Sequence, residues 1–353
     1  MNTDFLKRMK EYIPDEYASF LDTLNRPMYK GLRLNPGKMH KDLFLSKFNY
    51  VDEPSIFCKD AFYIHSNLGN HPYHTCGIYY LQEPSASSAV EILDVEESDI
   101  VLDLCAAPGG KSSQISSRIQ SGFLVSNEID AKRAQILLSN MERMGAKNFA
   151  VTNTTPQKIG SAFPCCFDKV LVDAPCSGEG MMKKHDEAKD NWSLDNIKLC
   201  ATRQKEILEE AYKVLKKEGI LVYSTCTYAK EENEEVIAHF LKEHEDMELL
   251  DVGISFGRRG LDTEGMDASK VCRIFPMDHG EGHFVAKLRK TGGTIHSLPY
   301  IKDKKTDPIV SKFLKEQLNT SIEHIYGSEK VYGMDFPFVD FKKIKLLRQG
   351  VCL

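Results

Sequence analysis

Several features typical of membrane and exported proteins are missing from this 353-residue sequence. It has no apolar run of about 18 residues, the length that a membrane-spanning helix requires. Its first stretch, MNTDFLKRMKEYIPDEY, has no apolar segment of the kind found in signal peptides. The ten cysteines include no CxxC pair and show no regular spacing, so neither a zinc site nor a disulfide framework is expected. We therefore expect a cytoplasmic protein with free thiols, no bound metal and no membrane partner.

Charge is unevenly distributed, although the formal net charge is only −5. Residues 1–50 carry nine Lys and Arg against six Asp and Glu, and residues 290–353 carry eleven against seven. Both ends are therefore basic, and the middle of the chain is acidic. Basic ends can contact the phosphates of a nucleic acid, but they can equally be ordinary solvated surface.

From residue 83 to residue 290, short apolar strands alternate with amphipathic helices. Repeated βα units predict a parallel, doubly wound α/β core. The last two predicted strands, joined by MDHGEG, favour an antiparallel hairpin at the end of a seven-stranded, mostly parallel Rossmann-like sheet. The predicted strands are Ile100–Leu104, Phe123–Asn127, Phe149–Val151, Val170–Val172, Ile220–Tyr223, Val271–Phe275 and His283–Leu288. The predicted helices are Pro84–Leu93, Lys111–Ile119, Ala131–Met144, Leu199–Leu215 and Glu232–Lys242.

Smaller α+β units are expected on either side of this core. Residues 1–82 form the N-terminal unit, and residues 291–353 form a C-terminal accessory segment with a basic end, FKKIKLLRQG. Helical spacing is seen over Phe5–Leu24, Lys41–Phe48 and Ile309–Leu318. Short strands are predicted near Gly31–Lys38 and Ala61–Ile64.

Three chemically reactive residues follow strands that should be neighbours. Asp173 and Cys176 come after one strand in KVLVDAPCSGEGMM, and Cys226 comes after another in GILVYSTCTY. Ligands of open α/β sheets bind at the carboxyl ends of the strands. Most cysteines are buried and unreactive, but those in turns after strands are presented by the scaffold. We predict inert, buried thiols for Cys58, Cys76, Cys105, Cys165, Cys166, Cys200, Cys272 and Cys352.

A second functional region is VLDLCAAPGGKSSQI, which predicts a strand, a tight glycine-containing turn and a helix. The glycines allow the backbone to approach a ligand, yet the turn matches neither GxGxxG nor GxxxxGK(S/T). Glu128 ends the next strand, where an acid accepts hydrogen bonds from ribose hydroxyls. A nucleoside cofactor without pyrophosphate fits, and we expect S-adenosylmethionine. The loop alone leaves NAD-like ligands open, but the end hairpin and the two cysteines argue against them.

Two cysteines and an acid suit methylation at C5 of cytosine, which is a poor nucleophile. A thiolate that adds to C6 allows C5 to attack a sulfonium methyl group. Only a few per cent of a free cysteine is thiolate at neutral pH, so a nearby cation or helix N-terminus should assist. An acid hydrogen-bonded to N3 would balance charge on the ring, and a base must then remove the C5 proton. Cys226, Cys176 and Asp173 are the candidates for these roles.

The motifs LDLCAAPGGK, VLVDAPCSGEGMM, YSTCTYAKEENE and the Asn191–Trp192 pair resemble the Nol/Nop/Sun RNA cytosine-C5 methyltransferases, in particular the bacterial 16S rRNA methyltransferase F group. LRLNP, YLQEPSAS and RIFPMDHGEGHFVAKLRK extend the resemblance over most of the chain. It implies an S-adenosylmethionine-dependent methyltransferase fold and 5-methylcytosine formation in small-subunit rRNA. It also implies that Cys226 is the nucleophile, that Cys176 assists product release, and that Asp173 lies beside cofactor and base. Glu128 is implied at the ribose. The residues implied around the cofactor are Cys105, Ala106, Ala107, Pro108, Gly109, Gly110 and Lys111.

The sequence departs from this family in two respects. The family often has an aspartate after the third strand that contacts adenine, whereas VTNTTPQ aligns Thr155 there, so Thr155 or Asn153 is expected to make this contact. Relatives also continue into a further C-terminal RNA-binding domain that is not found in this sequence.

The expected partner is RNA, either 16S rRNA or the small ribosomal subunit, with tRNA as the alternative and no DNA. A stacked target base would have to be flipped out. The end units are therefore candidates for holding RNA, with Arg26, Lys30, Arg33 and Lys38 as candidate contacts, although each can equally be solvated surface. The chain is expected to act as a monomer.

Two rival functions remain open at this point. A non-catalytic ribosome-assembly factor would have no need for both thiols and the acid. A methyltransferase for proteins or small molecules would keep its activity without Cys226.

Overall fold

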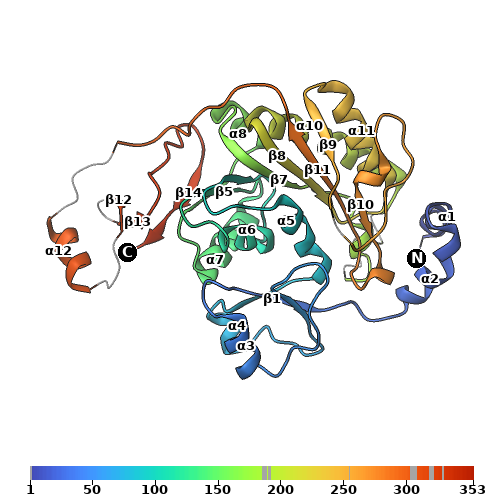
Figure 1. The fold of residues 1–353 in the computed structure, drawn as a ribbon, viewed down its shortest axis with the longest axis horizontal. Coiled ribbons are helices and arrows are strands. Elements are labelled where there is room, and N and C mark those ends of the chain that lie inside the picture. Colours follow the sequence, from blue (N-terminus) through green and yellow to red (C-terminus); the bar gives the residue numbers. More distant parts are fainter. Residues whose placement is uncertain are drawn as a thin grey trace.

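A computed structural model describes residues 2–353 except 185–188, 190–191, 254, 303–307, 318–321 and 328–329. In the described residues, the central feature is a nine-stranded sheet with the order β10-β11-β8-β7-β4-β5-β6-β14, in which β9 also pairs with β11 (Figure 1). Its strands are β4 (Ile100–Asp103), β5 (Phe123–Asn127), β6 (Phe149–Thr152), β7 (Phe167–Asp173), β8 (Leu215–Thr225), β9 (Met247–Leu250), β10 (Cys272–Ile274), β11 (His283–Lys290) and β14 (Leu346–Gln349).

All seven predicted strands are present, and the predicted sheet is confirmed. Strands β4 to β8 run parallel to one another. Strands β10 and β11 form the expected antiparallel hairpin, and β11 pairs antiparallel with β8. Two strands were not predicted. β9 adds to the hairpin, and β14 comes from the C-terminal segment and runs antiparallel to β6.

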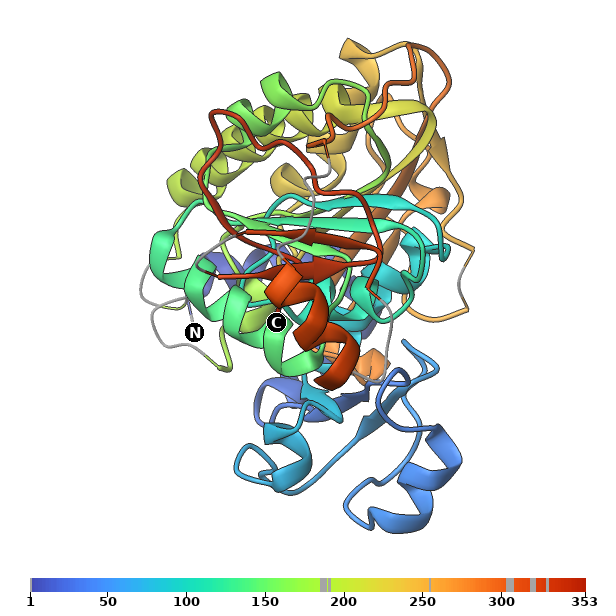
Figure 2. The same cartoon turned by 90° about the vertical axis from the view of Figure 1, so that its left-hand side faces the viewer.

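Helices cover both faces of the sheet (Figures 1 and 2). Successive strand residues such as Val101 and Leu102 are fully buried in different hydrophobic clusters, one on each face. This is why the strands read as continuous apolar runs. One face carries α5 (Ser88–Leu93), α6 (Gly110–Ser116) and α7 (Ala131–Met144), and the other carries α8 (Pro156–Ala162), α10 (Leu194–Val214) and α11 (Glu234–Glu243).

Local signals explain where the helices begin and end. The Asp130 side chain caps α7 by accepting a hydrogen bond from the Arg133 amide at 2.8 Å, and Gly145 ends this helix in the left-handed conformation. The bounds of α7 match the prediction. Helix α10 begins five residues before the predicted Leu199 because Ser193 caps it. Helix α8 was not predicted.

The N-terminal part has two pieces. Three antiparallel strands, in the order β2-β1-β3, pack with α3 and α4 below the core in Figure 1, whereas α1 and α2 lie beside β10. The predicted long helix is split because Pro14 begins a short 3-10 turn. The elements are α1 (Thr3–Tyr12), η1 (Pro14–Glu16), α2 (Tyr17–Leu24), β1 (Gly31–Leu34), α3 (Lys41–Lys47), β2 (Ala61–Tyr63), α4 (Pro72–Thr75) and β3 (Tyr79–Leu81).

The prediction that Arg33 contacts RNA is wrong. This side chain is 2% exposed and donates to the Gly110 carbonyl at 2.9 Å and to Ser113 Oγ at 2.8 Å. It therefore joins β1 to α6, and alternation with Leu32 and Leu34 alone would have placed this cation on the opposite, solvent-facing side. Arg26, Lys30 and Lys38 are exposed, although Lys38 Nζ also donates to two backbone carbonyls.

The C-terminal segment is tied to the core. Phe336 stacks on Phe123 of β5 with ring centroids 4.8 Å apart. The predicted helix is confirmed as α12 (Pro308–Gln317), and Leu318 lies outside the described residues. A separate sheet that was not predicted contains β12 (His324–Tyr326), β13 (Tyr332–Met334) and β15 (Val351–Cys352).

Short 3-10 turns complete the fold. They are η2 (Pro84–Ser87), η3 (Glu179–Met181), η4 (Lys230–Glu232), η5 (Ala268–Lys270) and η6 (Pro276–Asp278). Across the described ranges, every helix is too short or too polar to span a lipid bilayer.

Candidate active site

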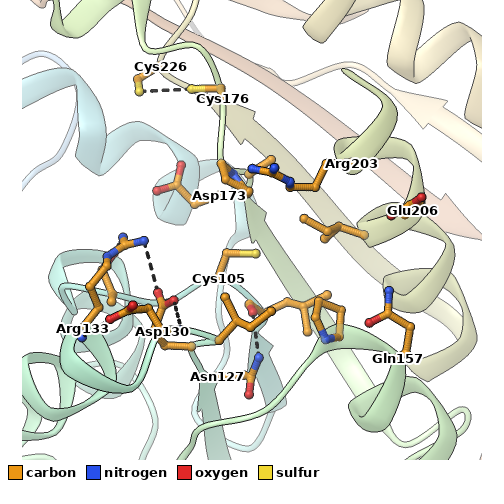
Figure 3. Close-up of a pocket in the computed structure, with 18 residues that line it drawn as sticks. Cys105, Asn127, Asp130, Arg133, Gln157, Asp173, Cys176, Arg203, Glu206 and Cys226 are labelled. Carbon is orange, nitrogen blue, oxygen red and sulfur yellow. Dashed lines mark hydrogen bonds and ion pairs between the residues drawn. The ribbon is translucent and has the colours of Figure 1, made fainter. Parts of the chain in front are cut away.

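A cavity of about 670 Å³ opens at the carboxyl ends of the parallel strands (Figure 3). The two thiols lie at one end, and polar residues that follow β5 lie at the other. Helix α10 forms a wall with Arg203 and Glu206. Pockets of this size commonly hold small ligands. The lining residues are Leu104, Cys105, Ala107, Asn127, Glu128, Ile129, Asp130, Arg133, Pro156, Gln157, Asp173, Ala174, Pro175, Cys176, Arg203, Glu206, Ile207 and Cys226.

The two predicted reactive cysteines face each other. Strands β7 and β8 are parallel neighbours in which Asp173 is paired with Ser224, so the turns that follow both strands start side by side. They place Cys176 Sγ 3.3 Å from Cys226 Sγ. This hydrogen bond with Cys226, together with burial and the Cys226 charge, raises the pKa of Cys176 well above its ordinary value. This raised pKa keeps Cys176 protonated, and either sulfur can be the donor in the contact.

The remaining cysteines are only partly as predicted. All ten cysteines are free thiols, and Cys58, Cys166, Cys200 and Cys272 are buried. The prediction of burial is wrong for the others, because Cys76 and Cys352 are exposed and Cys165 and Cys105 are partly exposed. The hydrophobic character of cysteine did not indicate that these thiols are exposed. Cys76 and Cys352 are exposed because they lie at the ends of short elements.

Asp173 forms a buried ion pair at the centre of the site. Its Oδ2 accepts a hydrogen bond from Lys111 Nζ at 2.7 Å, and its Oδ1 accepts one from Ser224 Oγ at 2.8 Å. Burial raises the pKa of Asp173, but the Lys111 ammonium and these hydrogen bonds outweigh it, so the pKa lies below its ordinary value. Asp173 is therefore a carboxylate, and its predicted hydrogen bond to N3 of the base stays a prediction. Lys111 was expected near the cofactor and is the cation that accompanies Asp173.

We expect the variant Lys111→Met to lose about 2 kcal/mol of unfolding free energy at pH 7, because it leaves a half-buried carboxylate without its cation. In the wild type, the depressed pKa of Asp173 contributes stability above the unfolded-state pKa of about 3.9, and this is lost as pH falls through the folded-state pKa. In the variant, burial raises the pKa of Asp173, so the carboxyl gains a proton at a higher pH. The stability difference should therefore narrow between pH 7 and pH 4 in urea unfolding.

The matched control is Lys132→Met, which replaces an exposed lysine on α7 and should change stability little. An equal loss for Lys111→Met at both pH values would instead indicate lost packing of the lysine stem.

The predicted cofactor loop turns tightly at the base of the cavity. Cys105 and Ala107 line the cavity, and the Ala106 amide donates to the Asn127 carbonyl at 2.8 Å. Gly109 has a φ of 109°, and a side chain there would also crowd Leu137, so glycine is required. The Pro108 carbonyl accepts a hydrogen bond from Asn140 at 2.8 Å, and Gly110 begins α6 against the N-terminal unit.

Glu128 occupies the other end of the cavity, as expected for an acid after β5. It is 3% exposed, and its Oε1 accepts a hydrogen bond from the Asp130 amide at 2.9 Å. Arg133 lies 3.6 Å from its Oε2 and donates to the Ala107 carbonyl at 2.7 Å. These contacts hold the acid against the cofactor loop.

The predicted contact between adenine and Thr155 or Asn153 stays a prediction. Pro156 and Gln157, which follow Thr155 directly, line the cavity, whereas Thr155 is the residue before α8. The Asn153 amide nitrogen donates to the Glu128 and Ile129 carbonyls, both at 2.9 Å. Asn153 therefore shapes the loop.

Several lining residues were missed by sequence reasoning. Arg133, Arg203 and Glu206 lie on helices, where charged residues usually indicate solvated surface. Asp130 was recognisable only as a helix cap, and Asn127 only as a strand end. Of the predicted Asn191–Trp192 pair, Asn191 lies outside the described residues.

Comparisons with known proteins agree with this geometry. A family model described as 16S rRNA methyltransferase RsmB/F matches residues 90–289. A second, described as the N-terminal domain of 16S rRNA methyltransferase RsmF, matches residues 1–84.

The curated relatives include ribosomal RNA small subunit methyltransferase F of Vibrio vulnificus (strain YJ016). It is 34% identical over 344 residues, covering 90% of this chain and 72% of the relative. The protein of the same name from Vibrio cholerae (strain M66-2) is 37% identical over 303 residues, covering 81% of this chain and 63% of the relative.

Two solved structures from Pyrococcus horikoshii share the fold. A methyltransferase homolog protein superposes with a TM-score of 0.72 and 29% identity, covering 82% of this chain and 95% of that one. NSun6, solved with SFG, has a TM-score of 0.72 and 20% identity, covering 83% and 99%, and shows likeness of fold.

Proposed function

This chain belongs to the 16S rRNA methyltransferase RsmB/F family, and from that premise we propose that Cys226 and Cys176 perform its cytosine-C5 methylation through a covalent cysteine–C6 adduct. The resemblance to the Nol/Nop/Sun enzymes is thereby confirmed, and the protein is an S-adenosylmethionine-dependent rRNA methyltransferase. The observation that carries the proposal is the 3.3 Å contact between the two thiols inside the cavity that also holds Asp173.

In the proposed reaction, Cys226 is the nucleophile. We propose that Cys226 attacks as the thiolate while Cys176 keeps its proton, and that the Cys226 Sγ forms a bond to C6 of the ring. The electron pair of the C5–C6 double bond then becomes available at C5. When bound, S-adenosylmethionine would supply the methyl group that C5 takes up, and its sulfur would keep the electron pair of the broken S–C bond and leave as a neutral thioether.

Cys176 is proposed to act in the second half of the reaction. Once the Cys226 sulfur is a thioether, its charge no longer opposes ionisation of Cys176, and the pKa of Cys176 falls. Cys176 can then lose its proton to water and take the proton from C5. The electron pair of that C–H bond restores the C5–C6 double bond, and the Cys226–C6 bond breaks with the electrons returning to sulfur.

Asp173 and Lys111 are proposed to hold the target base. As a carboxylate, Asp173 can accept a hydrogen bond from the base edge, and the Lys111 ammonium beside it can donate one. Their opposite charges can balance the charge that develops on the ring during attack.

The residues around the cavity fit a nucleoside cofactor. Glu128 is buried and already fixed by Asp130 and Arg133, so it can accept hydrogen bonds from ribose hydroxyls. We propose that the adenine lies toward Pro156 and Gln157, beside Thr155. The loop residues Cys105–Lys111 would enclose the rest.

We also propose that the two end units, residues 1–82 and 291–353, contact the RNA around the core of residues 83–290. Arg26 and Lys30 remain candidate contacts because both are exposed. The finer expectations of monomeric action in the cytoplasm stay predictions.

The first experiment uses Cys176→Ala with small ribosomal subunits and S-adenosylmethionine. Without the base that frees the product, the protein–RNA adduct should survive a denaturing gel. The adduct should be absent in Cys176→Ala/Cys226→Ala, because the nucleophile is missing.

The outcomes separate the roles of the thiols. Methyl transfer at the wild-type rate without an adduct would remove Cys176 from product release. An adduct that persists in the double variant would show that another residue attacks the ring.

A further inference from the structure

Two buried glutamates join the cysteine turns to each other. Glu179 follows Cys176 in η3, and Glu232 follows Cys226 in η4; they are 4% and 0% exposed. Neither takes part in the reaction described above. Burying a carboxylate is unfavourable unless several donors compensate it, so two of them beside a pair of thiols require a reason.

We call the turns after β7 and β8 the Cys176 turn and the Cys226 turn. Glu232 reaches from the Cys226 turn to the Cys176 turn. Its Oε2 accepts a hydrogen bond from the Ser177 amide at 2.9 Å, and its Oε1 accepts one from Ser177 Oγ. Gln204 of α10 donates to Oε2 at 2.8 Å and also to the Pro175 carbonyl at 3.0 Å. Three donors therefore satisfy this carboxylate, and two of them belong to the residue directly after Cys176.

Glu179 makes the same connection in the opposite direction. Its Oε2 accepts from Thr227 Oγ1 and from the Tyr228 amide, both at 3.0 Å, and these residues directly follow Cys226. Trp192 Nε1 donates to its Oε1 at 2.7 Å. Ser177 Oγ and Thr227 Oγ1 lie 2.9 Å apart, so the two turns are in close contact, while each hydroxyl gives its one proton to a glutamate.

The strands alone do not set the distance between the thiols. The last backbone pair of β7 and β8 is Asp173 with Ser224. The thiols lie three and two residues beyond it, in turns without strand pairing, where small backbone rotations would move the sulfur atoms by ångströms. The Gly180 amide donates to the Cys226 carbonyl at 2.9 Å, and the crossed carboxylates add side-chain restraints on both turns. Glu232 is also close enough for its charge to contribute, after Cys226 and burial, to the raised pKa of Cys176.

We propose that Glu179 and Glu232 are positioning residues whose reciprocal hydrogen bonds hold the Cys176 and Cys226 turns together and keep the two sulfur atoms in contact. The catalytic roles of the thiols in this inference rest on the proposed function, whereas the contact between them does not. It gives the two glutamates a task that an apolar core could not perform, because only directional hydrogen bonds fix the turns relative to each other.

The test measures thiol geometry and catalysis separately. Phenylarsine oxide bridges two adjacent thiols by forming two As–S bonds and releasing one water. The rate of bridging is measured by mass spectrometry. Any bridging that still occurs in Cys176→Ala comes from other cysteines and is subtracted from the rate of each protein. Methyl transfer to small subunits gives kcat and the KM for S-adenosylmethionine.

Glu232→Gln should slow bridging at least tenfold, because an amide has one acceptor oxygen where the carboxylate has two and cannot accept from the Ser177 amide, the Ser177 hydroxyl and Gln204 in the same arrangement. The value of kcat should fall at least tenfold while the KM for S-adenosylmethionine stays within about twofold, since a shift of about 1 Å in a reacting group can cost 10²-fold. Thr227→Val, which removes one hydroxyl with no change of charge, should show the same pattern. Glu235→Gln, on the exposed side of α11, is the control and should match the wild type.

The result that overturns the proposal is unchanged bridging in Glu232→Gln and Thr227→Val. If Glu232→Gln does not fold, Thr227→Val decides alone. A third outcome separates the two proposals. If both variants slow bridging relative to the wild type, the positioning role is supported. If Cys176→Ala then forms no RNA adduct, the covalent chemistry is rejected.

Discussion

Replacement of Cys226 by alanine is expected to lower methyl transfer to small-subunit rRNA by about 10⁴-fold or more, the scale seen when a catalytic nucleophile is removed. Without a sulfur bond to C6, C5 of cytosine remains too weak a nucleophile to take the methyl group. The measurement is single-turnover transfer of labelled methyl. Binding of S-adenosylmethionine should change little, because Cys226 lies at the thiol end of the cavity, away from Asp130 and Arg133, which contact Glu128 (Figure 3).

The matched control for this substitution is Cys76→Ala, which removes an exposed thiol in the N-terminal unit and should leave the rate near that of the wild type. A Cys226→Ala protein that retains more than about a tenth of the rate would refute the nucleophile assignment. It would also revive the rival in which the cysteines are structural.

The variant Asp173→Asn is expected to lower kcat by about 10³-fold, within the range for loss of an acid–base or charge-balancing group. The amide keeps the shape of the side chain but removes the negative charge opposite Lys111. Its oxygen can still accept from Lys111 and its nitrogen can donate to Ser224 Oγ, so the main change is the loss of charge. The base edge would then meet an unbalanced cation. Steady-state kinetics on small subunits give this value.

A second variant separates charge from catalysis. Asp173→Asn/Lys111→Gln removes both charges, so folding stability should recover relative to the single variant while kcat stays low. Recovery of kcat together with stability would mean that Asp173 acts only through the fold.

Much of the fold could be predicted because its strands are buried on both faces. Val170–Val172 and Ile220–Tyr223 are apolar without interruption, and such runs bounded by turns rarely have another explanation. The bounds of α7 could be predicted because Asp130 and Gly145 mark its ends. By contrast, β14 is short, polar and paired with β6, some two hundred residues away in sequence. No local pattern reports such a pairing.

The contact between the two thiols was predictable for a different reason. Parallel neighbouring strands deliver their following turns to one edge, so Cys176 and Cys226 had to meet once β7 and β8 were adjacent. The contacts that cross between turns were not predictable. Glu179 and Glu232 occur in segments rich in acids, GEG and KEENE, and only coordinates distinguish a buried carboxylate from its solvated neighbours.

Arg33 illustrates the limit of charge as a signal. A basic residue in a basic N-terminal unit suggested an RNA contact, yet its guanidinium is enclosed by backbone and hydroxyl acceptors of α6. Alternation with Leu32 and Leu34 places Arg33 on the opposite face of β1, and only the packing of α6 against that face buries it.

The pairing of β14 with β6 has a practical consequence for dissecting this protein. A fragment that stops at residue 290 would remove β14 and uncover the backbone N–H and C=O groups along one side of β6. It would also remove the Phe336 ring from Phe123. Open sheet edges next to apolar surface invite self-association. The catalytic core is therefore not a separable module, and biochemical work on it should retain the chain through β14.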